Sequence, residues 1–284
     1  MKGEDGVDLP LGDFRTRRRY LHPQLFAGND DDAQDYISPT DLIAEESWDG
    51  VMVLPTDVAL KSTSYAGSLI ARLHSLHSDW IFSWPDEEED APFMFETSLL
   101  AGEEFDALVF NATSGYYRQA IGCLRNALES LTVAASLSVH PNGWQLFSEW
   151  RNGTREVAFG QARAWLYDSS IGMAVESDAA PKSIFANQPS AWVNSRYAAL
   201  CHYAHSRPGY NNADFWESNG PIFVESALNA VEREFRETIA LAYLLLRLAW
   251  PKYAVGQGQP ALLAGPTTGW TDYVPMLKKW LGVV

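Results

Sequence analysis

The sequence has only two cysteines among its 284 residues, Cys123 and Cys201. Both lie inside apolar helical patterns and lack the spacing of metal ligands, which is typical of reduced, buried thiols in a cytosolic protein. A secreted domain held by disulfides is therefore not expected, and we expect neither a bound metal nor another cofactor.

Long apolar runs are also missing. The most apolar stretch, "TIALAYLLLRLAW" at residues 238–250, is interrupted by Arg247 and is shorter than the roughly 20 residues that cross a bilayer. The first fourteen residues, "MKGEDGVDLPLGDF", lack the apolar core of a secretory signal. We therefore expect a cytoplasmic protein with no membrane segment.

Basic residues are scarce as well: 21 Lys and Arg stand against 36 Asp and Glu, and the net charge is -15. Residues 1–50 hold twelve acidic and five basic side chains, and residues 86–106 hold nine acidic side chains and no basic one. Duplex DNA is an improbable partner for such a chain, since binding it requires extensive phosphate neutralisation. A local RNA site needs few cations and stays compatible, and the acidic segments suit a basic protein partner.

The first 50 residues are rich in Gly, Asp and Pro and sustain no apolar period. They predict an acidic, flexible tail, in which "RTRRRY" is either an arm for a partner or RNA, or simply a solvated segment. Residues 51–284 predict one helical-bundle domain.

The remaining chain is dominated by helical patterns separated by Pro and Gly loops, which predicts an all-α bundle with long antiparallel helices. The clearest apolar stripe has spacings of four, three, four, three and four residues, and consists of Tyr117, Ile121, Leu124, Leu128, Leu131 and Ala135. Pro221 suits the first turn of its helix. Helices are expected over 56–82, 93–112, 116–137, 143–150, 154–168, about 190–207, 220–250 and 271–282, with a loop over 168–189.

A polar stripe runs beside the apolar one on the 116–137 helix, and it includes Arg125 and Glu129 at i and i+4. One interpretation is an ion pair within the helix at the rim of the bundle. The other is that both side chains turn inward and hold a neighbouring helix in register.

The stretch "SRYAALCHYAHSRPGYNN" at 195–212 gathers several reactive side chains. At about 100° per residue, His202 and His205 lie about 60° apart, whereas Arg196 lies about 120° from His202. Metal binding would need more ligands, and a Cys201–His205 nucleophile pair lacks an orienting group. General acid–base work by a histidine beside arginines is the third chemistry, and it is the one that RNA cleavage through the 2′-hydroxyl requires.

The same stretch also admits a structural explanation. Arg207 precedes Pro208, which disfavours helical backbone at Arg207, so the helix should end there. His205 and Arg207 would then satisfy the last carbonyls and the dipole of that helix.

The combination of "LRNALE" at 124–129 with "YAALCHYAHSRPG" at 197–209 resembles the HEPN-like superfamily of prokaryotic helical proteins, which includes abortive-infection and toxin proteins. The family's catalytic pattern, Arg followed by four to six residues and His, is matched by Arg196 and His202. The resemblance implies a helical bundle that forms a homodimer, with both motifs at the shared interface, and acts as a metal-independent endoribonuclease.

In that family role Arg196 and His202 are catalytic, and His205 is a third catalytic candidate. The supporting candidates are Arg125, Glu129, Tyr203 and Arg207. Because Arg196 and His202 project from different sides of the helix, a second helix or subunit would complete the site.

Two hypotheses therefore follow from the sequence. The first is an endoribonuclease or toxin of a prokaryotic defence system. The alternative is a non-catalytic helical interaction module whose acidic segments bind a basic protein partner.

Overall fold

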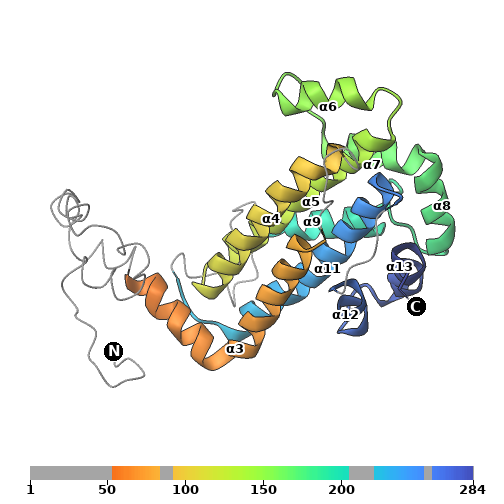
Figure 1. The fold of residues 1–284 in the computed structure, drawn as a ribbon. Helices are drawn as coiled ribbons and strands as arrows, with labels where there is room; N and C mark the ends of the chain where they lie inside the picture. Colours follow the sequence, from red (N-terminus) through yellow and green to blue (C-terminus); the bar gives the residue numbers. More distant parts are fainter. Residues whose placement is uncertain (1–52, 84–91, 205–220, 253–257, 284) are drawn as a thin grey trace. The chain divides into compact units, whose positions relative to one another are not determined.

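The computed structural model describes residues 53–83, 92–204, 221–252 and 258–283 (Figure 1). The chain divides into two compact units, Met1–Leu54 and Pro55–Val284, and only the second is described below. The tail predicted over residues 1–50 lies outside the described residues.

The regular secondary structure in the described part of the second unit is all helical, with no strand, which confirms the predicted all-α fold. It holds ten α-helices and one short 3₁₀ helix. The helices are α3 (Leu54–Ile81), α4 (Pro92–Thr113), α5 (Tyr117–Val139), α6 (Gly143–Arg151), α7 (Phe159–Asp168), α8 (Ser170–Ala179), α9 (Trp192–Ala204), α11 (Glu225–Ala249), α12 (Gly258–Ala264) and α13 (Val274–Leu281).

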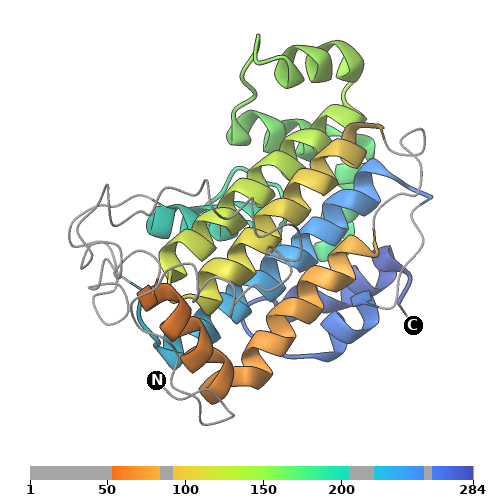
Figure 2. The same ribbon diagram turned by 60° about the vertical axis from the view of Figure 1, so that its left-hand side comes forward.

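Helices α4, α5 and α11 lie side by side in the middle of the unit (Figures 1 and 2). A tight turn joins α4 to α5 and makes them antiparallel. Gly115 adopts a positive φ of 84° in this turn, and a Cβ there would collide with the backbone of Ile222. The turn therefore combines a left-handed backbone with a close approach of another segment, and both require glycine.

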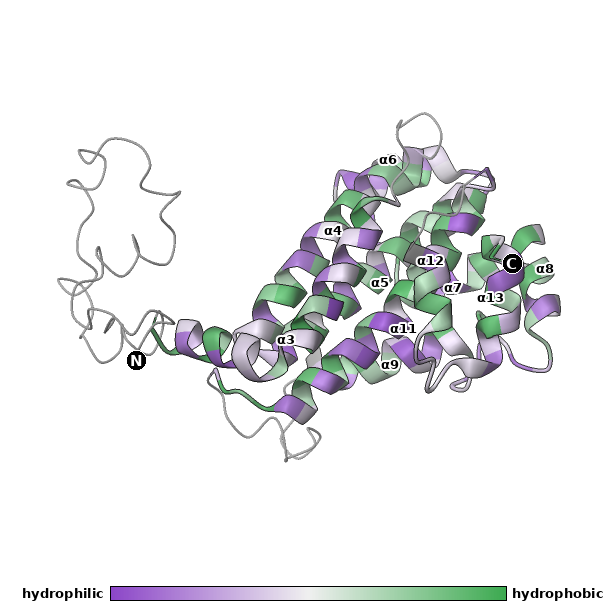
Figure 3. Ribbon diagram, turned by 60° about the horizontal axis from the view of Figure 1, so that its bottom comes forward, coloured by the Kyte–Doolittle hydropathy of each residue, from purple (hydrophilic) through white to green (hydrophobic). Residues whose placement is uncertain are grey.

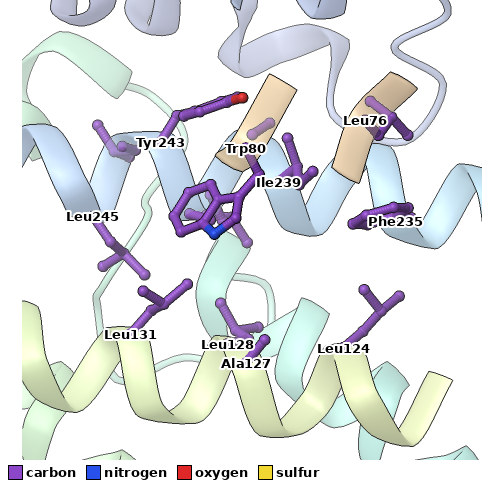
Figure 4. Packing of buried hydrophobic residues seen from close by; sticks show 14 of the residues in the cluster. Leu76, Trp80, Leu124, Ala127, Leu128, Leu131, Phe235, Ile239, Tyr243 and Leu245 are labelled. Carbon is purple, nitrogen blue, oxygen red and sulfur yellow. The ribbon is translucent and has the colours of Figure 1, made fainter. Parts of the chain in front are cut away.

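The apolar stripe of α5 is buried as the sequence predicts, with every one of its six residues at most 2% exposed. Trp80 of α3 lies between α5 and α11, among the side chains of Leu128, Leu131, Ile239 and Tyr243 (Figure 4). Its indole Nε1 donates a hydrogen bond of 3.1 Å to the carbonyl of Ser98, so this large polar-edged ring is buried without an unpaired donor.

Helix α3 bends at Ala66, where the backbone leaves helical geometry at φ -130° and ψ 33°. The half that follows the bend packs against α11: Arg72 contacts Glu232, and Trp80 contacts Tyr243. This half and α11 therefore run in the same direction, with α4 antiparallel to both.

Three sequence predictions about element boundaries were wrong. The 168–189 loop contains α8, which begins after Ser169, whose hydroxyl accepts a hydrogen bond from the amide of Gly172 at 3.0 Å. Pro221 is not in a first helical turn, because residues 221–224 are not helical and α11 begins at Glu225. The helix predicted over 154–168 begins only at Phe159. The helix predicted over 271–282 is confirmed as a 3₁₀ turn, Thr271–Tyr273, continued by α13, whose first turn accommodates Pro275.

Candidate functional site on helices α5, α9 and α11

Helix α9 carries three of the seven candidate residues, Arg196, His202 and Tyr203, and it packs beside α5. Among the α9 side chains that the structure describes, only three are at most 1% exposed: Trp192, Val193 and Leu200. Tyr197 and Tyr203 add partly buried contacts with the core, and two clusters of polar contacts join α9 to its neighbours.

The first cluster is centred on Arg196. One terminal nitrogen of its guanidinium lies 2.8 Å from a carboxylate oxygen of Glu234, and the other is paired with Glu237. The side chain of Arg196 is 11% exposed, and those of the two glutamates are 7% and 9% exposed. Trp192 donates its indole N–H to the remaining oxygen of Glu237 at 2.8 Å. Helix α9 is thus fastened to α11 by one arginine between two buried carboxylates.

In this cluster, two carboxylates of α11 share one buried guanidinium. Burial raises the pKa of the Glu234 carboxyl above its ordinary value; Arg196 opposes this shift, and the nearby Glu237 carboxylate adds to it. Arg233, an exposed residue of α11, lies 3.5 Å from Glu234 and also favours its ionised form. Because both terminal nitrogens of Arg196 are paired with these carboxylates and only 11% of its side chain is exposed, its guanidinium is committed to this cluster.

The second cluster joins α9 to α5. Arg125 and Glu129 form an i, i+4 ion pair at 2.9 Å, and the phenol of Tyr197 is inserted into it. Arg125 donates to the Tyr197 oxygen at 2.8 Å, and Tyr197 donates to Glu129 at 3.1 Å. The ring of Tyr197 stacks on Phe159 of α7 with 3.7 Å between centroids. Burial, followed by the charge of Glu129, raises the pKa of Tyr197, which therefore remains a neutral hydrogen-bond donor.

The sequence allowed Arg125 and Glu129 to be either an ion pair within α5 or a contact that holds a neighbouring helix, and in the structure they are both. The pair forms within α5 and is partly exposed, with 24% and 32% of the two side chains accessible. The same two side chains also hold a neighbouring helix through Tyr197. We conclude that they fix the register of α9 on α5.

The remaining candidates of the 195–212 stretch are placed differently. His202 is exposed in the last turn of α9. Tyr203 is half-buried, and its pKa is raised first by burial and then by the charge of Glu234, which places it beside the Arg196 cluster. His205 and Arg207 lie outside the described residues, so their predicted capping and catalytic roles are not tested.

The structure brings Arg196 together with residues of α11 that the sequence analysis did not single out, chiefly Glu234 and Glu237. The signal that would have drawn attention to them is "EREFRE" at 232–237, a charged run within an otherwise apolar helical pattern. Glu232 and Arg236 of the same run are also buried. Arg236 donates to the carbonyls of Leu262 at 2.8 Å and Pro266 at 3.2 Å, and so anchors the end of α12.

Of the two cysteines, Cys123 lacks the environment of a nucleophile. Both are free and half-buried, and burial together with the charge of Glu104 raises the pKa of Cys123 to about 12. Within the described ranges, no three His, Cys, Asp or Glu side chains are grouped so that they could hold a metal ion. None of the helices in those ranges is both long and apolar enough to cross a membrane.

No protein-family model, curated protein or solved structure matches this chain. Its function must therefore be argued from the geometry of its own residues.

Proposed function

We propose that this protein is a non-catalytic helical interaction module whose acidic segments bind a basic protein partner. The observation that carries the proposal is the placement of Arg196, whose guanidinium is held by two buried carboxylates. An arginine that stabilises a phosphorane must present its N–H groups to the phosphate. Arg196 instead neutralises Glu234 and Glu237, which is a structural task.

The distribution of negative charge supports the same proposal. Residues 86–106 carry nine acidic side chains and no basic one. Where the structure describes this segment, Glu103 and Asp106 are exposed on α4. Exposed charge of one sign steers a partner of opposite sign and selects against partners of like sign.

The proposal is tested by reconstitution with a purified partner. The tagged full chain is used to capture proteins from its own host, and each captured protein is identified, purified and titrated against the chain at low and moderate salt. We expect a basic partner whose dissociation constant rises with salt, and which binds more weakly when Asp86, Glu87, Glu88, Glu89 and Asp90 are changed to the corresponding amides. A partner that binds the neutralised variant as tightly as the wild type would contradict the proposal.

The second candidate function is the metal-independent endoribonuclease implied by the HEPN-like resemblance. The exposure of His202 at the end of α9 favours it, because a general acid or base must reach the substrate. A different arginine, from this chain or from a second copy in a homodimer, would have to take the place of the sequestered Arg196.

This candidate is tested by incubating the purified chain with RNA in the presence of a metal chelator. Cleavage that disappears in His202→Ala, with the fold intact by circular dichroism, would establish the nuclease and overturn the interaction module as the primary function. Absence of cleavage with total host RNA, or equal cleavage by the variant, would eliminate this candidate.

A further inference from the structure

One face of α4 is left without a partner in the described part of the bundle. The helix packs on α3 through Phe105 and Trp80, and on α5 and α11 through its buried residues. Yet Leu100 is 54% exposed and Phe110 is 67% exposed. Large apolar side chains that share a face on a well-packed helix are characteristic of contact sites.

These two side chains belong to a regular ridge. Leu100, Glu103, Ala107 and Phe110 follow one another at spacings of three, four and three residues, the spacing of the core positions of a coiled coil. At about 100° per residue they fall within an arc of about 80°, and the ridge is about 15 Å long. Helix α4 alternates hydrophilic and hydrophobic residues along its length (Figure 3). This set of four residues is called the α4 ridge below.

Carboxylates accompany the α4 ridge on every side. Glu103 is exposed at its centre. Glu104 lies on the flank toward α5, where it accepts a hydrogen bond from Asn126 at 3.3 Å. Asp106 lies on the flank toward α3, 4.0 Å from His77, with 74% of its side chain exposed.

We infer that the α4 ridge binds an amphipathic helix of a basic partner protein, whose apolar residues pack on Leu100, Ala107 and Phe110. The inference rests on the proposed function and names its surface. A basic side chain at the core position of the partner opposite Glu103 forms the central contact, and flanking Lys or Arg side chains meet Glu104 and Asp106. A charged residue within a coiled-coil seam selects partner and register by requiring a complement.

The charges favour a basic partner over a second copy of this chain. Pairing two α4 ridges would bring Glu103, Glu104 and Asp106 of one copy close to the same three carboxylates of the other. Like charges at the core and edges of a helix pair oppose association. A helix with Lys or Arg at these positions removes the repulsion and adds attraction.

The inference is tested with a designed peptide of about three heptads. It has Leu at the core positions, Lys at one central core position and Lys at the flanking positions, and it carries a fluorescent label. A second peptide has the same composition in an order that destroys the heptad spacing. Fluorescence anisotropy at about 0.15 M salt measures the binding of each to the full chain.

We expect the heptad peptide to bind at least about tenfold more tightly than the shuffled one, a difference of about 1.4 kcal/mol. The double substitution Leu100→Ala and Phe110→Ala should weaken binding by at least about tenfold. The matched control is Met173→Ala on α8, which removes a side chain that is 57% exposed elsewhere and should leave binding unchanged. Equal affinities for the two peptides, or equal binding by the double variant, would overturn the inference.

A charge exchange tests the central contact without altering the fold, because Glu103 is exposed. Glu103→Lys should weaken binding of the heptad peptide, and a peptide with Glu in place of its central core Lys should restore it. If this peptide binds Glu103→Lys no better than the original does, the assigned register is wrong. If sedimentation shows a wild-type dimer that the Leu100→Ala and Phe110→Ala variant loses, the occupant is a second copy and the inference fails.

The outcome separates this inference from the proposed function. A natural basic partner that depends on residues 86–90 but binds the Leu100→Ala and Phe110→Ala variant normally would leave the proposed function standing and move the site away from the α4 ridge. A chain that binds neither peptide nor any basic host protein would contradict both.

Discussion

Helices α4 and α9 both pack on α5, but they are attached by different forces. Helix α4 buries a row of apolar and small residues that includes Ala101, Phe105, Leu108 and Ala112. Helix α9 relies on Arg196 at α11 and Tyr197 at α5, with few fully buried apolar side chains. Apolar packing is spread over many contacts, whereas charged clusters concentrate the attachment in single side chains. The attachment of α9 is therefore more sensitive than that of α4 to single substitutions and to pH.

The largest loss of stability should come from Arg196→Ala, which leaves Glu234 and Glu237 buried without their counter-ion. Removing one partner of a buried ion pair costs about 3–5 kcal/mol, and we expect a loss of about 4 kcal/mol in the free energy of unfolding. Urea denaturation measures it. The control is Arg233→Ala, since that side chain is 55% exposed and should contribute no more than about 0.5 kcal/mol. Equal losses for the two variants would show that α9 does not depend on the buried cluster.

The apolar interface gives the next largest effect. Leu124→Ala on α5 should lower the free energy of unfolding by about 3 kcal/mol, because the side chain is fully buried and its removal leaves a cavity. Unlike the Arg196 variant, this loss should be the same at pH 5 and pH 7. Leu100→Ala, which shortens an exposed leucine, should cost less than about 0.5 kcal/mol in the same denaturation experiment.

A pH titration sharpens the comparison further. The pKa of Glu234 is raised in the folded state, so between its unfolded and folded pKa values the folded protein binds more protons than the unfolded chain. The Glu234 contribution to stability is therefore greatest at and below the unfolded pKa, and it decreases as pH rises through the folded value. It amounts to about 1.4 kcal/mol for each unit by which the pKa is raised.

Glu234→Gln removes this titration. The stability of the wild type relative to the variant, measured by urea denaturation from neutral pH down to the ordinary range of a glutamate, should increase as pH falls. A relative stability that decreases on acidification would mean that the folded pKa is lowered, and that Arg196 outweighs burial at this carboxyl.

Apart from the two control variants, the smallest loss of stability is expected from Tyr197→Phe. The variant keeps the ring that stacks on Phe159 but loses the hydroxyl that links Arg125 to Glu129. Since the cluster is partly exposed and the Arg125–Glu129 ion pair persists, the loss should be about 1 kcal/mol. A double-mutant cycle with Glu129→Gln measures the coupling, and a coupling energy near zero would show that the hydroxyl does not hold α9 to α5.

The sequence predicted the helices whose apolar period is regular, and it failed where tertiary contacts override local pattern. The α5 stripe repeats without a break, so its buried face could be read directly. Helix α8 was missed because Gly, Ala and Ser dominate its short sequence and Pro181 lies just beyond it. The start of α11 was placed too early because Pro221 suits a first turn. In the structure the amide of Val224 instead donates to the Tyr117 hydroxyl at 2.8 Å, and the chain is not yet helical there.

The sequence predicted the angular positions of the candidate residues around α9, but not the residues of other helices that pair with them. Helical geometry placed Arg196 and His202 on different sides of one helix, and the structure has Arg196 against α11 and His202 exposed. The sequence around Arg196 does not indicate that its guanidinium pairs with Glu234 and Glu237, which lie about 40 residues further along the chain. Such pairing depends on how the helices pack, which a spacing argument within one helix does not contain.

Helix α6 has a small apolar cluster of its own, in which Leu146 and Phe147 pack with Phe93 and Leu137, separate from the main core. The turn that follows it, residues 152–154, is exposed and includes Gly153 at a positive φ of 68°. Exposed turns of this kind tolerate lengthening of the chain, since few contacts have to be rebuilt. A short affinity tag inserted at Gly153 should therefore be tolerated by the fold, although Arg151, two residues earlier, pairs with Glu96 of α4 at 2.8 Å and brings this turn close to the start of that helix.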